Sequence, residues 1–467
     1  MMFLERVRKM EQVKENKMGT QPINKLLLSM SLPIMISMLV QALYNIVDSI
    51  FVAKISENAL TAVSLAFPIQ NLMIALGAGT GVGINALLSK SLGEKNYEQA
   101  NKAANNGIFL VVINFLIFLL FGLFFTDIFY ASQTNVPNID PKNAVIIKEY
   151  GKEYLSVVCL LSVGLFAQIT FERLLQSTGR TIYSMYTQGL GAIVNIILDP
   201  CLIFGVGFFP KMGVTGAAVA TVIGQFCAAA LGLFFNVKVN KELHINPIKY
   251  RPDGKTIEKI YAVGLPSIIM QSIGSVMTYT MNKILILFST TAVAVFGIYF
   301  KLQSFIFMPI FGLNNGMIPI VAYNFGARKK ERILNTMKVA VTYAVSIMAV
   351  GLIIMQLFPG TLLKLFEADE KMLGIGIPAL RIISTHFILA GVSIVITATF
   401  QALSHGFFSM IISMARQLLV LLPTAYLFSR LGNVNYIWWC FPIAEIVSLT
   451  LCLIFFKKIK RTQIDTL

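Results

Sequence analysis

The sequence predicts an all-α integral membrane protein with twelve transmembrane helices in two six-helix lobes, related by a pseudo-two-fold axis along the membrane normal. Three observations predict this fold class. The composition is strongly apolar, with 56% hydrophobic and 13% charged residues and a mean hydropathy of +0.74, whereas soluble domains are roughly 45–50% apolar. Long apolar stretches recur along the whole chain, and the second half repeats residues of the first half in the same order.

Each apolar stretch is long enough to cross a membrane as one helix. A hydrocarbon core of about 30 Å needs roughly 20 residues at about 1.5 Å per residue. The expected spans are residues 26–53, 60–87, 104–126, 151–172, 183–206, 213–237, 260–288, 293–322, 337–358, 377–403, 409–429 and 436–456.

The expected domain organisation follows from these spans. Residues 1–25 form a cytoplasmic N-terminal segment, 26–237 the N-lobe, 238–259 a cytoplasmic loop between the lobes, 260–456 the C-lobe, and 457–467 a cytoplasmic basic tail. None of the polar segments is long enough to bury a core of its own. We therefore expect no soluble domain, such as a nucleotide-binding domain.

An offset of 233 residues, which places Pro33 on Pro266, aligns the two halves of the chain from residue 31 to residue 98 without a gap. The identical pairs are Leu32/Leu265, Pro33/Pro266, Ser56/Ser289, Ala59/Ala292, Phe67/Phe300, Gln70/Gln303, Gly79/Gly312, Gly83/Gly316, Gly93/Gly326 and Glu98/Glu331. An even number of spans in each half gives both lobes the same orientation, as in transporters built from parallel repeats. Such an architecture suits alternating access, in which two lobes rock about a shared site.

The net charge of +16 comes mainly from Lys and Arg in the loops on one side of the spans, where both termini lie. Because cytoplasmic loops collect Lys and Arg, we expect both termini in the cytoplasm and the protein in the cell membrane. The expected partners of this basic face are anionic membrane lipids, not nucleic acid. Arg173 and Arg416 are assigned to the cytoplasmic face, whereas Lys283 and Lys301 fall inside spans.

The sequence contains no constellation typical of catalysis or metal binding. Its five cysteines lie in apolar runs without C-x-x-C spacing, its histidines are scattered, and it has no G-x-S-x-G motif. We therefore expect neither an enzyme nor a resident metal or cofactor. The glycine-rich "GAGTGVG" at 77–83 lacks the Gly-Lys-Ser/Thr ending of a phosphate-binding loop. Its small-xxx-small spacing favours close helix packing.

Acidic residues inside membrane spans are costly and indicate function by default. In the first expected span, Tyr44, Asn45 and Asp48 follow Gln41 by three, four and seven residues, so the four side chains share one helical face. We expect this stripe to line a polar pocket.

The fifth expected span carries a second acid. Asn195 precedes Asp199 by four residues, again on one face, and Pro200 removes a backbone donor beside the acid. We expect Asp48 and Asp199 at similar depth, with Gln70 of the second span nearby. Burial favours the protonated form of a carboxyl group, so such a pocket could take up and release a proton. The alternative is that both acids only clamp helices together through hydrogen bonds.

Other charged residues inside the spans are interpreted differently. Glu172, in "FERLLQSTGR", is expected to be solvated or paired with the adjacent Arg173 and to take no part in transport. In the C-lobe, Lys283, Lys301 and Glu445 form an expected charge cluster in which at least one lysine pairs with the glutamate. The sequence does not decide whether this cluster only balances charge or takes part in a transport cycle.

Five segments of the chain, taken together, carry a family resemblance. They are "LYNIVDSIFVAKI", "NIILDPCLIFG", "GVTGAAVATVIGQ", "FKLQSFIFMPIFGLNNGMIPIVAYNFGA" and "MARQLLVLLP". With the two-lobe pattern, they resemble the multidrug and toxic compound extrusion (MATE) family, most of all its bacterial MepA-like branch, over essentially the whole chain. The resemblance implies a cation-coupled antiporter for cationic amphipathic drugs. It implies that Asp48, Asn195 and Asp199 couple the cation, with Tyr44 and Thr221 beside them.

The expected coupling ion is a proton, with sodium as an alternative. Two carboxylates, an asparagine and backbone carbonyls could also hold sodium. Some family members carry further acids in the seventh and tenth spans for sodium coupling, but "PSIIMQSIGSVMTYTMN" and "ISTHFILAGVSIVITATFQAL" contain none. The candidate substrate-binding residues beside the coupling site are Gln41, Tyr44, Asn45, Gln70 and Thr221.

Two classes of function are compatible with the fold: a drug/proton antiporter, and a flippase or exporter of a lipid-linked or metabolic substrate. A flippase for polyanionic headgroups should line its cavity with several Arg or Lys. The sequence places only Lys283 and Lys301 inside spans, against Asp48, Asp199 and Glu445. We therefore expect an antiporter for small cationic molecules, acting as a monomer because two complete lobes need no partner chain.

Overall fold

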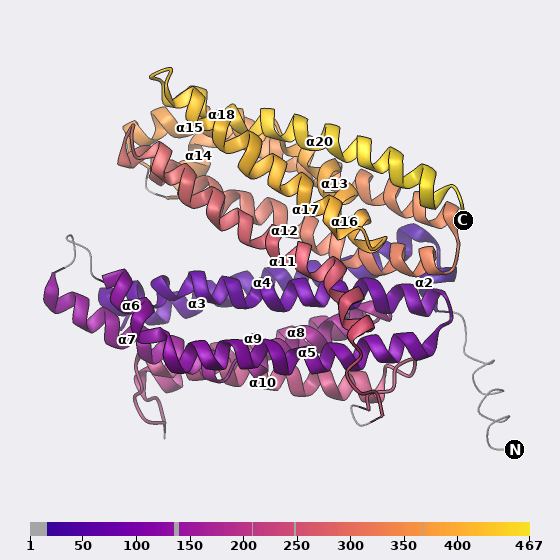
Figure 1. Cartoon of the computed structure of the whole chain (residues 1–467). Coiled ribbons are helices and arrows are strands. Elements are labelled where there is room, and N and C mark those ends of the chain that lie inside the picture. The colour runs from indigo at the N-terminus through magenta and orange to yellow at the C-terminus, as the bar shows by residue number, and fades with distance from the viewer. Residues whose placement is uncertain (1–15, 135–139, 208, 247–248, 367) are drawn as a thin grey trace, which may run out of the picture.

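The computed structural model describes residues 16–134, 140–207, 209–246, 249–366 and 368–467, and this part of the chain contains helices and loops but no strand. The helices form two bundles that run in roughly the same direction (Figure 1). The bundles lie close together at the end that carries α2 and the C-terminus, and they diverge toward the opposite end. We call these the terminal end and the far end.

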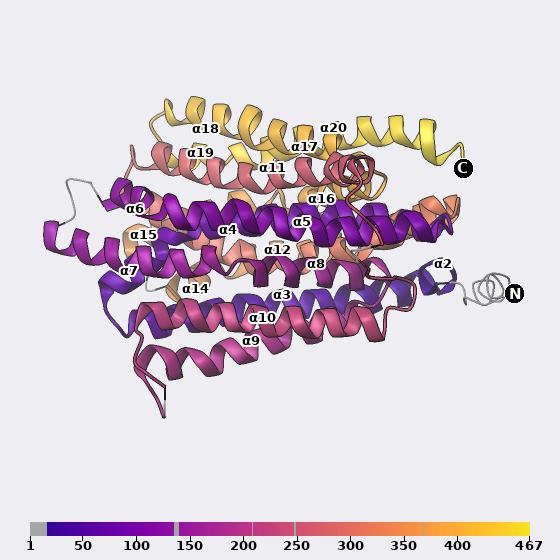
Figure 2. The same ribbon diagram turned by 60° about the horizontal axis from the view of Figure 1, so that its bottom comes forward.

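The N-lobe comprises α3–α10 and is preceded by the short helix α2. The bounds are α2 Lys17–Thr20, α3 Ile23–Ala53, α4 Glu57–Gly93, α5 Tyr97–Phe124, α6 Thr126–Thr134, α7 Pro141–Leu160, α8 Val163–Ser177, α9 Thr181–Phe204 and α10 Val214–Lys238. Helices α3, α9 and α10 pack side by side (Figure 2).

The C-lobe comprises α11–α20 and two π-helical turns, η1 and η2. The bounds are α11 Gly254–Leu285, α12 Thr290–Gly326, α13 Lys330–Leu357, α14 Pro359–Lys364, α15 Glu370–Ser384, α16 Phe387–Ala402, α17 Gly406–Met414, η1 Ala415–Leu421, α18 Leu422–Ser429, α19 Val434–Ile437, α20 Cys440–Ile459 and η2 Lys460–Ile464. Much of the expected basic tail is therefore a continuation of the last helix.

The number of spans agrees with the sequence prediction. Ten helical segments in the described part are long and apolar enough to cross a membrane. Two bent pairs, α7 with α8 at 46° and α15 with α16 at 47°, give twelve if each pair is one span. The bend changes the fourth span most, because its helices run from Pro141 to Ser177, well beyond the expected 151–172.

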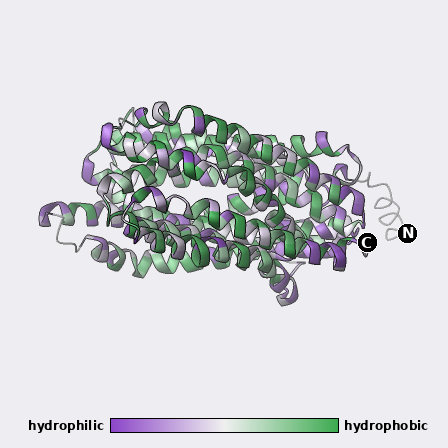
Figure 3. Cartoon of the chain, turned by 90° about the horizontal axis from the view of Figure 1, so that it is seen from above, coloured by the Kyte–Doolittle hydropathy of each residue, from purple (hydrophilic) through white to green (hydrophobic). Residues whose placement is uncertain are grey.

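Hydrophobic residues predominate along the middle of the helices, while hydrophilic residues gather toward both ends (Figure 3). On α5, for example, Ile113, Leu116, Leu120 and Leu123 are exposed along one side. An apolar surface of this kind faces lipid in a membrane protein, since helices satisfy their own backbone hydrogen bonds.

Glycines at the terminal end let the two lobes touch backbone to backbone. A β-carbon on Gly93 of α4 would overlap the carbonyl oxygen of Tyr323 of α12, and one on Gly326 would overlap the carbonyl oxygen of Lys90. These two contacts are related by the 233-residue offset of the sequence repeat. Within 77–83, where close packing was predicted, a β-carbon on Gly83 would likewise overlap the carbonyl oxygen of Ile260 of α11. The predicted close packing is thus confirmed, and it joins the lobes.

The same symmetry recurs at two further glycine pairs. Gly79 packs on Ile268 of α11, and its repeat partner Gly312 packs on Met35 of α3. The repeat extends to helix capping, because the Ser56 hydroxyl accepts from the Ala59 amide at 3.1 Å as Ser289 accepts from Ala292 at 3.0 Å. The pseudo-two-fold relation is therefore visible in individual contacts.

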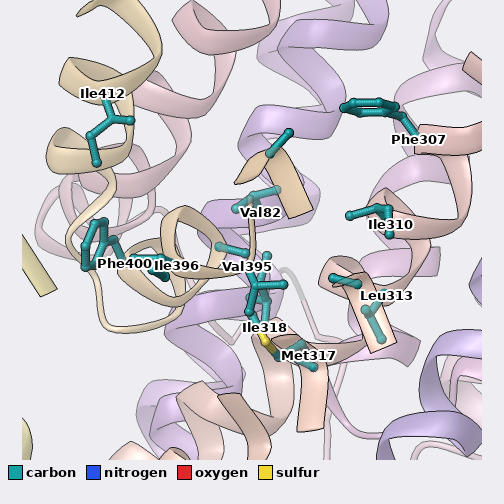
Figure 4. Packing of buried hydrophobic residues seen from close by; sticks show 14 of the residues in the cluster. Val82, Phe307, Ile310, Leu313, Met317, Ile318, Val395, Ile396, Phe400 and Ile412 are labelled. Carbon is teal, nitrogen blue, oxygen red and sulfur yellow. The ribbon is translucent and has the colours of Figure 1, made fainter. Parts of the chain in front are cut away.

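A shared apolar core backs this interface. In Figure 4, Met317 and Ile318 of α12 lie beside Val395 of α16, with Val82 of α4 next to them. The cluster thus contains residues of both lobes.

Residues 16–21, which we call the terminal clasp, bind both lobes. The Asn16 amide donates to the Thr178 carbonyl at 3.1 Å and to both carboxylate oxygens of Glu242 at 3.0 Å. On the C-lobe side, Arg332 donates to the carbonyl oxygens of Met18 at 3.0 Å and Gln21 at 2.8 Å. The clasp therefore ties the lobes together at the terminal end.

Candidate functional site

Asn195 and Asp199 lie one turn apart on α9 and are both buried, with Asp199 0% exposed. The Asn195 amide nitrogen donates to Asp199 Oδ1 and to the Thr221 hydroxyl of α10, each at 3.3 Å. Pro200 follows directly inside the helix, and it leaves the carbonyl of Ile196 without its helical donor. The fifth span thus carries a polar cluster beside a weakened stretch of backbone.

Asp48 of α3 approaches this cluster from the neighbouring helix. It interacts electrostatically with Asp199, Tyr44 and Tyr154. In the described part of the chain, Asp48 Oδ1, Asp199 Oδ2 and Asn195 Oδ1 are buried acceptors without a hydrogen-bond donor. A proton or a small cation would satisfy such oxygens and relieve the repulsion between the two carboxylates.

The predicted substrate residues separate into three groups. Gln41, Tyr44 and Thr221 line a cavity between the lobes, as Asn195 does. Gln70 is not part of the cavity wall, and its amide donates to the Tyr154 hydroxyl at 3.1 Å. Asn45 differs from the expectation, because it is exposed and is not part of the cavity wall.

The cavity has a volume of about 490 Å³, within the range of small-molecule sites, and helices of both lobes form its wall. Gln188 of α9 donates to Gln41 of α3 at 2.9 Å and so joins two N-lobe helices at its edge. Side-chain amides dominate the polar part of the wall: Gln41, Gln168, Gln176, Gln188, Asn195, Gln225, Gln271, Asn314, Asn315 and Gln401.

Two charged residues of α8 that the sequence had assigned elsewhere also line the cavity. Glu172 accepts from the Gln168 amide at 3.0 Å and from the Thr187 hydroxyl at 3.4 Å, and it interacts electrostatically with its neighbour Arg173. Arg173 donates to Asn315 of the C-lobe at 2.9 Å and to Gln176 at 3.0 Å. The assignment of Arg173 to the cytoplasmic loops was therefore wrong.

The extra length of the fourth span explains this error. The expected span ended at residue 172, at the edge of the membrane, whereas α8 continues to Ser177. The bend lies at the helix break before Val163. Hydropathy alone carries no signal for such a bend.

The C-lobe charge cluster has a different composition from the one expected. Arg416 Nη1 lies 3.3 Å from Glu445 Oε2. Lys283 lies over the ring of Tyr279 and Lys301 over that of Phe366, each 5.7 Å from the ring centroid. Both lysines are exposed, so each can keep its ammonium group in a polar environment without a carboxylate. The predicted Lys–Glu445 pair was wrong. Arg416, which was counted on the cytoplasmic face, lies inside the expected span 409–429 and lines the cavity.

A two-lobed bundle with a polar cavity between the lobes is the architecture of a membrane transporter, and sequence comparison defines the family. The MatE family model matches residues 33–201 and 266–427, more than half of the chain. The matches begin at the two prolines of the internal repeat. The chain belongs to the MatE family of multidrug efflux transporters.

Particular relatives extend over nearly the whole chain. Multidrug export protein MepA of Staphylococcus haemolyticus is 28% identical over 91% of each chain. The FAD transporter of Shewanella oneidensis is 25% identical over 96% of this chain and 98% of the relative. A solved outward-facing conformation of a multidrug resistance MATE family transporter of the MOP superfamily has a TM-score of 0.86 at 25% identity, covering 97% of this chain and 98% of that chain. These findings confirm the family and the MepA resemblance.

Proposed function

We propose that the protein is a proton-coupled antiporter that exports amphipathic organic cations across the cell membrane by alternating access, without a cofactor and as a monomer. The observation that carries this proposal is the cluster of Asp48, Asp199 and Asn195, with three buried acceptor oxygens that lack donors, directly beside the cavity between the lobes. MepA of S. haemolyticus, named a multidrug export protein, supports the substrate class.

In the proposed cycle, the two carboxylates of the N-lobe exchange a proton for the substrate. A proton on Asp199 or Asp48 removes their mutual repulsion and lets α3 and α9 pack more closely. Gln41 and Gln188, which bridge these helices, then shift at the cavity edge. Pro200 removes one backbone hydrogen bond of α9, so α9 is the helix that can bend.

Alternating access requires the lobes to separate where they now touch. In the proposed orientation the terminal end faces the cytoplasm, because Lys and Arg concentrate there. The contacts of Gly93 and Gly326 and the terminal clasp close this end. The described conformation then corresponds to the outward-open state, and release of these contacts opens the cavity inward.

Sodium is the alternative coupling ion. Hard cations prefer oxygen ligands from carboxylates and amides, and the free oxygens of Asp48, Asp199 and Asn195 supply that chemistry. A proton remains our proposal because two neighbouring carboxylates can share one proton with no further ligand.

Export of a metabolite is the second candidate function. Two observations favour it: Arg173 and Arg416 both line the cavity, and a relative at 25% identity is named an FAD transporter. The two arginines remove the argument from the sequence that too few cationic residues line the cavity to bind an anionic substrate.

Ethidium movement in liposomes tests the proposal. Purified protein is reconstituted, and a pH gradient and a sodium gradient are imposed separately on wild type, Asp48→Asn and Asp199→Asn. We expect transport driven by the pH gradient alone and its loss in both variants. Asp127→Asn is the matched control, because Asp127 is an exposed acid paired with Lys148 and Lys152. If only the sodium gradient drives transport, the coupling ion is sodium and not a proton. If neither gradient drives ethidium movement, the proposed class of cationic substrates is wrong.

A further inference from the structure

We propose that the C-lobe side of the cavity contains an oxyanion subsite formed by Arg416, so that the protein also takes zwitterions and organic anions with a carboxylate or phosphate group. This inference rests on the proposed function only in using the same cavity as the export route. It concerns which charges the cavity accepts, and not the coupling ion.

Arg416 is presented to the cavity by a buried acid behind it. Its Nη1 contacts Glu445 Oε2 at 3.3 Å, and the Arg416 side chain is 27% exposed whereas that of Glu445 is 3% exposed. Arg416 also lines a second cavity of about 800 Å³, which Glu445 and His386 border as well. Arg416 therefore contributes to the walls of both cavities.

The guanidinium group has donors to spare. Arginine has five N–H donors and keeps its charge in proteins, yet within the described residues only Nη1 of Arg416 has a hydrogen-bond acceptor. The remaining Nε and Nη2 donors form one edge of the fork, which matches a carboxylate or a phosphate in a bidentate arrangement.

Other polar atoms near the Arg416–Glu445 pair also lack hydrogen-bond partners in the described part of the chain. Glu445 Oε1 and the Tyr299 hydroxyl are buried and lack hydrogen-bond partners among the described residues. Tyr299 interacts electrostatically with both members of the pair. A group that only joined η1 to α20 would gain from saturating these atoms, because buried unpaired polar groups are costly. Of these atoms, the Tyr299 hydroxyl can donate to an oxyanion, whereas Glu445 Oε1 can only accept, as from a donor group of a zwitterion.

The local backbone also marks this position. Arg416 lies in η1, a π-helical turn inside an otherwise α-helical span. Such turns are rare and frequently occur at functional sites, because the wider turn redirects one side chain.

The charges of the cavity favour a zwitterion or anion over a purely cationic ligand at this side. The negative charge of Glu445 is balanced by Arg416, and Glu172 already accepts two hydrogen bonds from N-lobe side chains. Arg173 adds a second guanidinium group from the opposite lobe. The amide-rich wall between them suits planar rings with several donors and acceptors, while the acids Asp48 and Asp199 are not part of the wall.

Three fluorescent probes separate charge from ring recognition: flavin mononucleotide, which carries a phosphate, riboflavin, which has the same ring without phosphate, and ethidium, a cation. Their dissociation constants are measured with the purified full chain in detergent. We expect wild type to bind flavin mononucleotide about tenfold or more tightly than riboflavin, as one charge-assisted contact allows.

The double variant Arg416→Gln,Glu445→Gln removes the charges together, so no unpaired ion is left in the protein. We expect its dissociation constants for flavin mononucleotide and riboflavin to become about equal, while its unfolding temperature in detergent stays close to that of wild type because no buried charge is left unpaired. Arg430→Gln is the matched control, since Arg430 is exposed at the end of the same span. It should keep the wild-type ratio.

Two results would overturn the subsite. The first is equal affinity of wild type for both flavins. The second is a double variant that keeps the wild-type ratio of the dissociation constants for flavin mononucleotide and riboflavin. An absence of ethidium binding in wild type would count against the proposed cation export, and the flavin ratio would still decide the subsite. The two proposals can thus fail separately.

Discussion

The side-chain amide of Asn195 donates a hydrogen bond to the Asp199 carboxylate one turn further along the same helix, at 3.3 Å. The same nitrogen donates to Thr221, so one amide ties the acid of α9 to α10. Asp199 keeps its second oxygen free, next to Asp48. Asn195 therefore fixes where the acid stands while leaving it able to bind a proton.

Asn195→Ala should uncouple transport without unfolding the protein. The variant removes a donor to a charged group, an interaction worth about 1.5–3 kcal/mol, and we expect proton-driven ethidium export to fall about tenfold or more. Asn143→Ala is the control, because Asn143 is an exposed asparagine that accepts from Asn58. Export by Asn195→Ala at the rate of this control would show that the amide has no part in coupling.

Gly93→Ala should disfavour closure of the terminal end. The added carbon would meet the Tyr323 carbonyl oxygen of the other lobe, and overpacking of this kind costs about 1–3 kcal/mol. We expect single-cysteine probes placed at the terminal end to react faster with a water-soluble maleimide. Gly297→Ala in α12 meets nothing within 4 Å, so it should leave labelling unchanged. Equal labelling in both variants would contradict closure by glycine contacts.

Much of the fold could be predicted because it follows from local composition and from a repeat. Pairs such as Gly79/Gly312 are visible as identities in the sequence, and they form equivalent contacts between lobes. The i,i+4 spacing likewise predicted the Asn195–Asp199 pair, which the structure joins. In contrast, Thr221 was predicted as a site residue from the family resemblance alone, because no sequence pattern in its helix indicates it.

The charged residues of the cavity could not be predicted in the same way. Arg173 was assigned to the cytoplasmic face because the expected span 151–172 ends just before it, and Arg416 was counted on the same face although it lies inside the expected span 409–429. The bend between α7 and α8 and the π turn η1 move these residues to the cavity. Both features depend on packing between helices, and Glu445 pairs with the cation that packing brings near it.

Glu242 should make the terminal clasp sensitive to pH. Burial raises the pKa of Glu242 above its ordinary value, although Arg180 and the Asn16 amide act in the opposite direction. Between the unfolded pKa of about 4.3 and the raised folded pKa, the folded state binds more protons than the unfolded state. This contribution to stability is complete below the unfolded pKa and is lost as pH rises through the folded pKa.

Glu242→Gln removes the titration and leaves an amide oxygen to accept from Asn16. The difference in unfolding temperature, wild type minus Glu242→Gln, should therefore decrease from pH 4 toward neutral pH in detergent. Taking the difference cancels other groups, including Lys17, whose pKa is lowered by burial and by Arg180. A difference that is flat or that increases with pH would contradict the raised pKa of Glu242.

Glu445→Gln should destabilise the C-lobe, whereas Lys283→Gln should not. The first change leaves the Arg416 guanidinium without an anionic partner. Breaking a fully buried pair costs about 3–5 kcal/mol, and because Arg416 is 27% exposed to a polar cavity we expect about 1–3 kcal/mol, near the value of a lost charged hydrogen bond. The free energy of unfolding in mixed micelles titrated with a denaturing detergent measures the loss.

Lys283 has only the ring of Tyr279 beside it in the described structure, and an exposed cation–π contact is worth about 0.5–1 kcal/mol. If Glu445 depended on a lysine, as sequence reasoning expected, Lys283→Gln or Lys301→Gln would be as costly as Glu445→Gln. The double variant Arg416→Gln,Glu445→Gln should recover most of the stability lost in Glu445→Gln, because no charge then remains unpaired. Such recovery is the signature of a direct interaction between Arg416 and Glu445.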